Sequence, residues 1–298
     1  MKKKYNVLLL GLGNIAMGYD LARDDVCWTH LKAISMHINF TLISAIDPDV
    51  KKRAVFENST GLSAYSTLQE FFCSKHPDID LVVIATPTSQ HLKNYREVKE
   101  LNPSLVVMEK PLANSIEKLD ILKSEMINGP NIIVNLFRLY QHGLNKKLAE
   151  LNLSGYCNIQ VRYSQTLLHN GIHFITLIES HFGRCLSSKK VLIDGEACFI
   201  LAFKNASAVF QKSSPDLDDN SMTVQSSLGT FYYLNGGRIT FFIDSVHIKT
   251  EFDQHEFNFH MLNVYDQCFK FFESKSDESL SLAISGQSTL LKCEEQDA

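Results

Sequence analysis

A glycine-rich turn near the N-terminus has the spacing needed to hold a dinucleotide. Residues 11–16 read Gly-Leu-Gly-Asn-Ile-Ala, a G-x-G-x-x-A turn that follows the apolar run 5–10. Glycine permits the tight turn and lets backbone amides approach a pyrophosphate, which the positive end of the next helix then favours. The pattern alone is weak, but directly after a strand it predicts a dinucleotide site. We expect cofactor contacts at Gly11, Gly13, Asn14 and Ile15.

An acidic residue, Asp47, ends the second apolar run, 40–46. A carboxylate at that strand end accepts hydrogen bonds from ribose hydroxyls and repels a 2′-phosphate, which favours NAD over NADP. The basic residues 51–53 follow closely, so NADP stays the alternative. Asp47 lies farther along than the roughly 20 residues usual for this fingerprint, and an insertion within 19–29 explains the excess. The structural alternative is that Asp47-Pro48-Asp49 starts a turn and caps a helix.

Up to about residue 136, short apolar runs alternate with helix-length segments. The runs cover 5–10, 40–46, 81–85, 105–108 and 131–137. Continuous Val/Ile/Leu runs are typical of strands buried on both faces, and their alternation with helices implies right-handed crossovers in a parallel sheet. The sequence therefore predicts a doubly wound α/β domain over residues 1–136.

From residue 137 to 298 the pattern changes to β-rich stretches broken by polar turns. Strands are expected at 156–165, 191–203, 206–211, 222–226, 230–234, 238–243 and 246–250. Turns such as 204–205 and 235–237 indicate hairpins, so this part is an α+β domain with a large, mostly antiparallel open sheet. Helices near 138–151, 170–182 and 256–273 are expected to cover one face, and 213–220 to form an exposed loop. The aromatic-rich strands need further cover, which predicts a homodimer or homotetramer through this sheet.

Two further motifs follow strands of the first half. Residues 85–91 read Ala-Thr-Pro-Thr-Ser-Gln-His, and residues 109–113 read Glu-Lys-Pro-Leu-Ala. With the glycine turn and Asp47, this succession resembles the glucose-fructose oxidoreductase, inositol dehydrogenase and rhizopine-catabolism (Gfo/Idh/MocA) family over nearly the whole chain. E-K-P is the most specific element.

The resemblance implies a Rossmann domain followed by an α+β domain whose open sheet often builds the oligomer interface. It also implies a lysine near the nicotinamide, which Lys110 matches, and a cis peptide before Pro111. Further cofactor contacts are expected at Ala85, Thr86, Pro87, His91, Glu109 and Lys110. An ordinary helix-start position for His91 and a purely structural role for Glu109 stay open.

In the second domain the family carries a D-x-x-x-H pair at a helix start. Here residues 169–175 read His-Asn-Gly-Ile-His-Phe-Ile, so the histidine is His173 while the usual aspartate is His169. A further aspartate, common three positions after the histidine, is Thr176. Some relatives that act on nucleotide-linked sugars in surface-polysaccharide pathways lack the first aspartate and carry a similar segment. This favours a sugar or sugar nucleotide as substrate.

Oxidation of a secondary alcohol needs a base for the hydroxyl proton while the hydride leaves for nicotinamide. An imidazole titrates near neutrality and serves as donor or acceptor, so we assign His173 as acid/base. We assign Lys110 to orient and polarise the substrate oxygen; the reverse assignment stays open.

Four other residues are expected to bind substrate: His169, Asn170, Arg138 and Asn135. His169 lies four positions before His173 and would share its helix face. This pair lacks the glutamate of H-E-x-x-H and a third ligand, so no metal is assigned. Asn135 and Arg138 resemble a family N-x-x-R element facing the interdomain cleft, and pairing of Arg138 with a structural carboxylate is the alternative.

The sequence thus predicts an NAD(P)-dependent dehydrogenase or reductase acting on a CH–OH group of a sugar, cyclitol or nucleotide-linked sugar. A non-catalytic NAD(P)-binding regulatory or scaffold protein is one alternative, motivated by the missing aspartate. A lyase or glycosidase that recycles its NAD internally is another.

Bulk composition excludes other classes of function. The 298 residues are 45% apolar and carry a net charge of −4, which is typical of a globular protein and does not fit a nucleic-acid binder. No run approaches the ~20 apolar residues of a membrane span, and 7–10 is too short for a secretory signal. Seven cysteines with no C-x-x-C pair indicate free thiols in a reducing cytoplasm.

Overall fold

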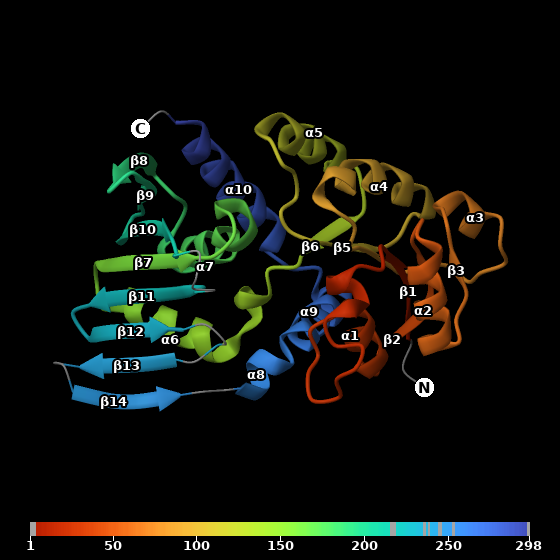
Figure 1. The fold of residues 1–298 in the computed structure, drawn as a ribbon, viewed down its shortest axis with the longest axis horizontal. Coiled ribbons are helices and arrows are strands. Elements are labelled where there is room, and N and C mark those ends of the chain that lie inside the picture. The colour runs from red at the N-terminus through yellow and green to blue at the C-terminus, as the bar shows by residue number, and fades with distance from the viewer. Residues whose placement is uncertain are drawn as a thin grey trace. The chain divides into compact units, whose positions relative to one another are not determined.

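The computed structural model describes residues 4–214, 219–234, 237, 239–243, 246–251 and 254–296 (Figure 1). The chain divides into two compact units: Met1–Asn135 with Asn258–Leu280, and Leu136–Phe257 with Ser281–Ala298. The first division lies next to the expected one after residue 136. The return of 258–280 to the first unit was not expected.

Six parallel strands form the sheet of the first unit, in the order β3-β2-β1-β4-β5-β6. They are β1 (Tyr5–Leu10), β2 (Phe40–Ile46), β3 (Ala64–Tyr65), β4 (Leu81–Ile84), β5 (Leu105–Met108) and β6 (Asn131–Val134). The order reverses between β1 and β4, which makes the carboxyl ends of these strands the ligand edge of such a sheet. The doubly wound fold is confirmed; the two-residue edge strand β3 was not predicted.

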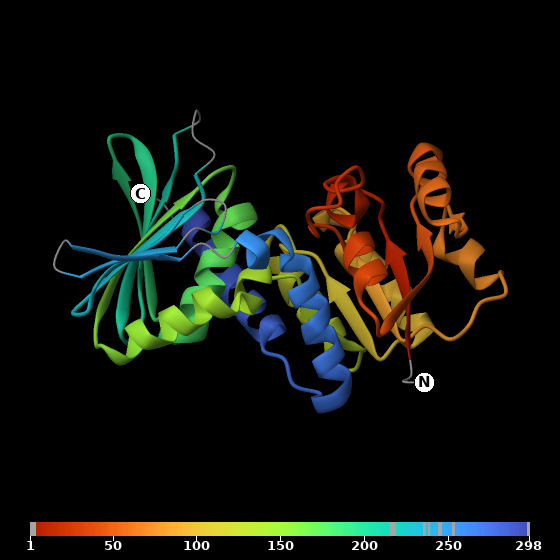
Figure 2. The same cartoon turned by 90° about the horizontal axis from the view of Figure 1, so that it is seen from below.

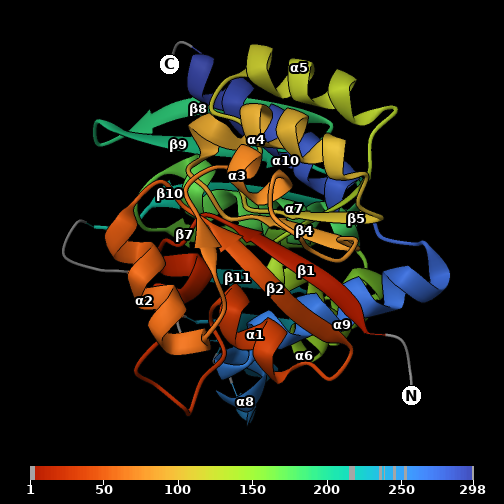
Figure 3. The same ribbon diagram turned by 90° about the vertical axis from the view of Figure 1, so that its right-hand side faces the viewer.

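Helices cover both faces of this sheet because its central strands are apolar throughout; all four residues of β4 and of β5 have no exposed surface. They are α1 (His30–Met36), α2 (Val50–Thr60), α3 (Leu68–Phe72), α4 (His91–Val98), α5 (Ile116–Met126) and α9 (His260–Ser274), with the short turns η1 (Asn14–Gly18), η2 (Thr88–Gln90) and η3 (Lys99–Leu101). Figure 3 shows α4 and α5 on one side of the strands and α1 and α9 on the other.

Helix α9 corrects one prediction. The segment 256–273 was expected to cover the C-terminal sheet, but α9 packs on the first unit. Phe272 stacks on Tyr5 with ring centroids 3.8 Å apart, and Tyr265 meets Phe40 edge-on at 5.5 Å. The apolar stripe of the helix shows that one face must be buried, but not which sheet it will meet.

The loop 19–29 between η1 and α1 is the insertion expected from the late position of Asp47. The Asp20 carboxylate is 2% exposed and closes it, accepting hydrogen bonds from the backbone N–H of Trp28 at 2.6 Å and of Thr29 at 2.9 Å, and from the Thr29 hydroxyl at 2.6 Å. Thr29 in turn caps α1 by accepting from the N–H of Lys32 at 3.2 Å. The insert is therefore an ordered loop with its own buried anchor.

Eight strands form the sheet of the second unit, in the order β14-β13-β12-β11-β7-β10-β9-β8. They are β7 (Cys157–Tyr163), β8 (Ser187–Ile193), β9 (Glu196–Ala202), β10 (Ala206–Lys212), β11 (Ser221–Ser226), β12 (Gly229–Tyr233), β13 (Ile239–Ile243) and β14 (Val246–Glu251). Only β7 and β10 pair in parallel, so the mostly antiparallel sheet is confirmed.

The predicted strand 191–203 is wrong in one respect, because it is two strands of a hairpin. The turn between β8 and β9 holds Asp194 and Gly195 at φ 52° and 83°, the left-handed conformations of a tight hairpin turn. Part of the predicted loop 213–220 (215–218) and part of the predicted turn 235–237 (235, 236) lie outside the described residues.

The second unit also contains η4 (Phe137–Tyr140), α6 (His142–Leu153), η5 (Leu167–Gly171) and α7 (Ile172–Phe182), while α8 (Gln254–Asn258) and α10 (Ser279–Glu295) adjoin the unit boundaries. Along β7 the odd-numbered side chains are buried and the even-numbered ones exposed, which is the pattern of a sheet covered on one face. Figure 2 shows this sheet close to edge-on, with α6 and α7 along one face. No helix within the described residues has the length and apolarity to cross a bilayer, and all seven cysteines are free thiols.

Candidate active site

Gly11 lies where β1, β2 and β4 end together. Its N–H donates to the carbonyl of Ile46 at 2.7 Å, and its φ is +88°. A Cβ at this position would lie 2.7 Å from the carbonyl oxygen of Ala85 and 3.0 Å from the N–H nitrogen of Thr86. Because both contacts are backbone atoms, only glycine allows the three strand ends to come this close.

Gly13 occupies a different environment. Its φ is −80°, and an added Cβ would meet nothing within 4 Å. Its carbonyl accepts from the N–H groups of Ala16 and Met17 at 3.1 and 3.0 Å, so the next residues form the turn η1. No side chain caps the start of this turn. The open side of Gly13 and the first amides, at Asn14 and Ile15, are where a pyrophosphate would bind.

The helix expected after the glycines is short. Turn η1 is a five-residue π-helical turn, and α1 begins only at His30. The inserted loop 19–29 separates the two, so the partial positive charge at the turn comes from the local amides.

Asp47, 6% exposed, connects the glycine turn to the start of α2. Its carboxylate accepts from the N–H of Leu12 at 2.7 Å and from that of Asp49 at 2.9 Å, and Lys52 Nζ lies 3.8 Å away. The cap of α2 is Asp49, which accepts from the N–H of Lys51 at 2.8 Å. Asp47 therefore holds the loop in which it was predicted to bind ribose, and that binding stays a prediction.

Thr86 and Pro87 follow β4 at the same edge. The Thr86 hydroxyl accepts from the Asn94 amide at 2.7 Å, and Pro87 is the residue before η2. His91 is 1% exposed, with Nε2 3.0 Å from the Thr86 carbonyl and Nδ1 3.3 Å from the Leu112 carbonyl. Burial lowers the pKa of its imidazole, although these carbonyls act in the opposite direction. His91 thus joins the loops after β4 and β5; direct cofactor contact stays a prediction.

The end of β5 holds a buried acid beside the candidate lysine. Glu109 is 7% exposed; its Oε1 lies 2.9 Å from His30 Nε2 and accepts from the Asn135 amide at 2.5 Å. Burial alone would raise the pKa of this carboxyl, but the hydrogen bonds from His30 and the Asn135 amide and the Lys110 charge bring it below its ordinary value. Lys110 is half-buried and is followed by the expected cis bond to Pro111.

Two unexpected side chains complete this buried cluster. His30 Nδ1 lies 3.0 Å from the hydroxyl of Tyr265, and both residues are fully buried. The Asn135 amide also points at Met261 Sδ, 3.7 Å away, while its Oδ1 is buried without a hydrogen-bond partner in the described chain. No local pattern in the sequence reveals that His30 and Tyr265 meet; Thr29 as a helix cap is the only signal near them.

In the second unit His173 is 5% exposed on α7. Its ring packs on Phe137 with centroids 4.9 Å apart. Phe137 also contacts the guanidinium of Arg138, 4.6 Å from the ring centroid. The structure thereby brings together two predicted site residues, His173 and Arg138, on one aromatic ring.

Arg138 is a buried cation inside an aromatic cage. It is 8% exposed, and its guanidinium carbon lies 4.7 Å from the Phe174 ring centroid and 5.7 Å from that of Tyr233, in addition to Phe137. Its Nε has no hydrogen-bond partner, and no ion pair joins it to a carboxylate of the described chain. The alternative of a structural salt bridge is therefore not what the described residues show.

His169 and Asn170 lie in η5, directly before α7. His169 is exposed, unlike His173, and its N–H donates to the Thr166 hydroxyl at 3.0 Å. Asn170 donates to Asn220 Oδ1 at 2.6 Å, and its own Oδ1 is buried without a partner in the described chain. The two histidines therefore do not share one face as expected, because His169 is exposed and His173 is buried.

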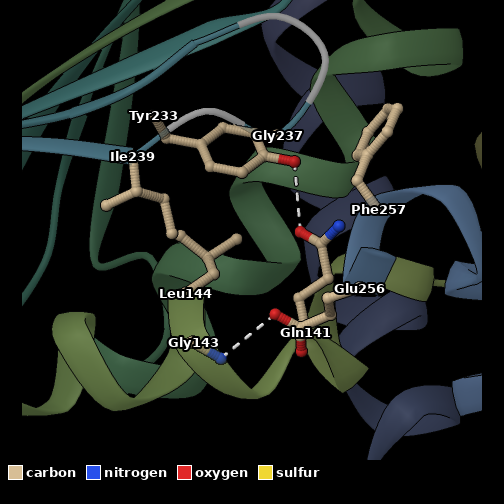
Figure 4. Close-up of a pocket in the computed structure, with 8 residues that line it drawn as sticks. All are labelled: Gln141, Gly143, Leu144, Tyr233, Gly237, Ile239, Glu256 and Phe257. Atoms are coloured by element: carbon tan, nitrogen blue, oxygen red, sulfur yellow. Dashed lines mark hydrogen bonds between the residues drawn. The ribbon is translucent and has the colours of Figure 1, made fainter. Parts of the chain in front are cut away.

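A separate pocket of the second unit lies beside the cage (Figure 4). Tyr233 donates to Gln141 Oε1 at 3.1 Å, and the Glu256 carboxylate accepts from the N–H groups of His142 and Gly143. Glu256 thus caps α6, which lacks a side-chain cap of its own. These polar groups satisfy one another, and we assign the pocket no ligand. The described residues also hold no cluster of three or more metal-ligating side chains.

Comparison with known families decides the class of the N-terminal half. Residues 5–133 match the Gfo/Idh/MocA family model, described as an oxidoreductase family with an NAD-binding Rossmann fold. This match covers the first unit up to β6 and none of the second unit's sheet. The Gfo/Idh/MocA match confirms the predicted family and the predicted nicotinamide cofactor class. No curated protein matches the chain by sequence.

Solved structures share the fold over the whole chain. The WlbA dehydrogenase of Bordetella pertussis, in complex with NADH and UDP-GlcNAcA, has a TM-score of 0.76 at 18% identity, covering 98% of this chain and 96% of that one. A myo-inositol dehydrogenase of Corynebacterium glutamicum gives 0.73 at 15%, covering 98% and 96%. A 3-ketoreductase of Actinomadura kijaniata, in complex with TDP-benzene and NADP, gives 0.75 at 12%, covering 97% and 96%. At these identities the likeness shows a shared fold for the chain and does not by itself assign an activity or a substrate.

Proposed function

We propose that the chain is an NAD(P)-dependent oxidoreductase that transfers a hydride between the nicotinamide and a hydroxyl or keto carbon of a sugar, cyclitol or nucleotide-linked sugar. The observation that carries this proposal is the position of Lys110 at the end of β5. It follows the buried carboxylate of Glu109 at the ligand edge of a domain that matches the NAD-binding family model. NAD is the preferred cofactor because Asp47 presents a carboxylate beside the glycine turn.

The bound nicotinamide would accept or supply the hydride. In the oxidation direction, His173 takes the hydroxyl proton, and Lys110 donates a hydrogen bond to the same oxygen as it becomes a carbonyl. Lys110 belongs to the first unit and His173 to the second. The proposed reaction requires the ammonium group and the imidazole to reach the same substrate oxygen.

The environment of Arg138 narrows the substrate class. A guanidinium removed from water without a carboxylate partner is costly, and an anionic ligand group would compensate for the lost hydration. WlbA, a structural neighbour, was crystallised with UDP-GlcNAcA. We propose that the substrate carries an acidic group bound by Arg138, with Asn135, Asn170 and His169 contacting the rest of the sugar. This chemistry fits the sugars of surface-polysaccharide biosynthesis.

Two further parts of the proposal concern the protein in the cell. The free cysteines fit a reducing cytoplasm. The face of the second sheet that carries Asn158, Gln160 and Arg162 is exposed in the single chain, and we propose that it forms a homodimer or homotetramer interface.

Turnover on a substrate panel tests the proposal. Purified protein is offered sugars and sugar nucleotides while the absorbance of the reduced cofactor is followed. Lys110→Met and His173→Asn should abolish turnover with cofactor affinity retained, whereas Lys118→Met, on the exposed side of α5, should leave both unchanged. Cofactor binding without turnover on any substrate would show a non-catalytic protein, and product without net cofactor change would show internal recycling.

UDP-glucuronate and UDP-glucose, which differ by one carboxylate, test the role of Arg138. Arg138→Met should weaken binding of the acidic sugar by roughly 10- to 100-fold, the value of a charged hydrogen bond, and leave the neutral one nearly unchanged. Equal losses for both sugars would refute the anionic site.

A further inference from the structure

We propose that His30 and Tyr265 are positioning residues for Lys110 and act on it through the Glu109 carboxylate. We call the three linked side chains Tyr265, His30 and Glu109 the buried relay. The inference rests on the function proposed above, because it concerns the lysine assigned to the substrate oxygen.

The relay is assembled from three distant parts of the first unit. His30 is the first residue of α1, Glu109 follows β5, and Tyr265 lies on α9. The Tyr265 hydroxyl is 3.0 Å from His30 Nδ1, and His30 Nε2 is 2.9 Å from Glu109 Oε1. His30 and Tyr265 are 0% exposed and Glu109 is 7% exposed, so water has little part in these contacts.

The direction of the hydrogen bonds follows from the two end groups. Burial raises the pKa of the Tyr265 hydroxyl well above its ordinary value, so this hydroxyl keeps its proton and can donate it to His30 Nδ1. That ring then carries its own proton on Nε2 and donates it to Glu109, whose pKa is held low. The tyrosine thereby selects the histidine tautomer that can stabilise the carboxylate.

The carboxylate is the point at which the relay reaches Lys110. Asn135 donates to the same oxygen at 2.5 Å, so Glu109 Oε1 is held by two donors. Glu109 and Lys110 are adjacent in the chain, and their opposite charges attract. A carboxylate fixed in this way fixes the backbone at the end of β5 and presents a constant negative charge to the ammonium group.

Two buried thiols near the relay keep their protons at neutral pH. Burial raises the pKa of the Cys27 thiol to about 12 and that of the Cys268 thiol well above its ordinary value, and both thiols act electrostatically on the Tyr265 hydroxyl. Burial lowers the pKa of His91, which also senses the charge of Glu109. Neither thiol therefore adds a charge beside that of Glu109.

The tautomer of His30 is the first measurement. In ¹⁵N-histidine spectra of the wild-type protein, we expect His30 to carry its proton on Nε2. Tyr265→Phe removes only the hydroxyl that donates to Nδ1, so this tautomer should no longer be the single form of the ring. Tyr95→Phe is the matched control, because the Tyr95 hydroxyl is buried without a hydrogen-bond partner in the described chain. A wild-type His30 protonated on Nδ1 would overturn the relay.

The titration of Lys110 is the second measurement, and it requires no substrate. Lysines are converted to ¹³C-dimethyl-lysine, which keeps the charge, and the Lys110 signal is assigned by its loss in Lys110→Arg. In Glu109→Gln we expect Lys110 to titrate about one pH unit lower, because a nearby opposite charge is removed. Tyr265→Phe should move it in the same direction by less, and Tyr95→Phe should not move it. Unchanged titration in both relay variants would overturn the inference.

The two proposals fail in different ways. If these shifts appear in a protein that turns over no sugar with either cofactor, the relay stands and the proposed function is wrong. If Lys110→Met abolishes turnover while the Lys110 titration is the same in Glu109→Gln, Tyr265→Phe and wild type, the function stands and the relay is wrong.

Discussion

Replacing each of the two glycines of the dinucleotide turn by alanine separates the fold from the binding of cofactor. At Gly11 an alanine must adopt φ +88° and place its Cβ 2.7 Å from the Ala85 carbonyl oxygen. The left-handed conformation costs about 1–2 kcal/mol, and displacing packed backbone costs roughly 1–3 kcal/mol more. We therefore expect Gly11→Ala to lower the free energy of unfolding by about 2–5 kcal/mol.

At Gly13 the same substitution meets no atom within 4 Å, and the φ of −80° suits alanine. Stability should be unchanged or rise by about 0.4–1 kcal/mol, because the unfolded chain loses freedom. The methyl group would instead occupy the space from which a pyrophosphate approaches, so NAD affinity should fall at least roughly tenfold.

Urea unfolding and calorimetric titration with NAD measure the two effects on the same samples. We expect Gly11→Ala to lower the free energy of unfolding, and Gly13→Ala to lower the NAD affinity without lowering the free energy of unfolding. Wild-type NAD affinity in Gly13→Ala would refute pyrophosphate binding at the open side of Gly13. Wild-type stability in Gly11→Ala would refute the close approach of the three strand ends.

Three further changes test other parts of the first unit. Asp47→Asn should weaken NAD binding roughly tenfold and raise the NADP-to-NAD affinity ratio, since the charge opposing a 2′-phosphate is lost; an unchanged ratio in paired titrations would contradict this. Asp20→Ala leaves the buried N–H of Thr29 and the partly buried N–H of Trp28 without their acceptor and should cost about 2–4 kcal/mol of unfolding free energy in urea, whereas a loss well below 1 kcal/mol would show that the inserted loop has no anchor there. Burial lowers the pKa of His91, so the folded chain binds fewer protons than the unfolded one and loses stability as pH falls below the ordinary histidine pKa of about 6.5. His91→Gln should flatten the dependence of the urea midpoint on pH between about 7 and 5, and an unaltered slope would exclude that contribution.

Much of the first unit could be predicted because its signals are local. The apolar runs that end at Leu10, Ile46 and Ile84 are strands, and each is followed within a few residues by the group expected at a ligand edge. A strand buried on both faces has to be apolar along its whole length, so sequence alone identifies it. The two-residue strand β3 has no such run and was missed.

The candidate site was predicted residue by residue but not as an assembly. The motifs located Lys110 and His173, and the described structure adds their surroundings: a buried acid beside the lysine and Phe137 against the imidazole. The contacts of His91 with two backbone carbonyls could not be predicted either, because the local sequence at a buried helix start does not differ from that at an exposed one.

The sequence by itself determined the main parallel strands of the first unit, the glycine turn and the resemblance of the N-terminal half to an oxidoreductase family. These depend on periodicity and on conformations that only glycine adopts. Only the tertiary structure decided that α9 returns to the first sheet and brings Tyr265 to His30, that Asp20 closes the inserted loop, and that Arg138 lies among three rings. Such contacts join residues far apart in the chain, and an amphipathic segment specifies that it must be buried without specifying its partner.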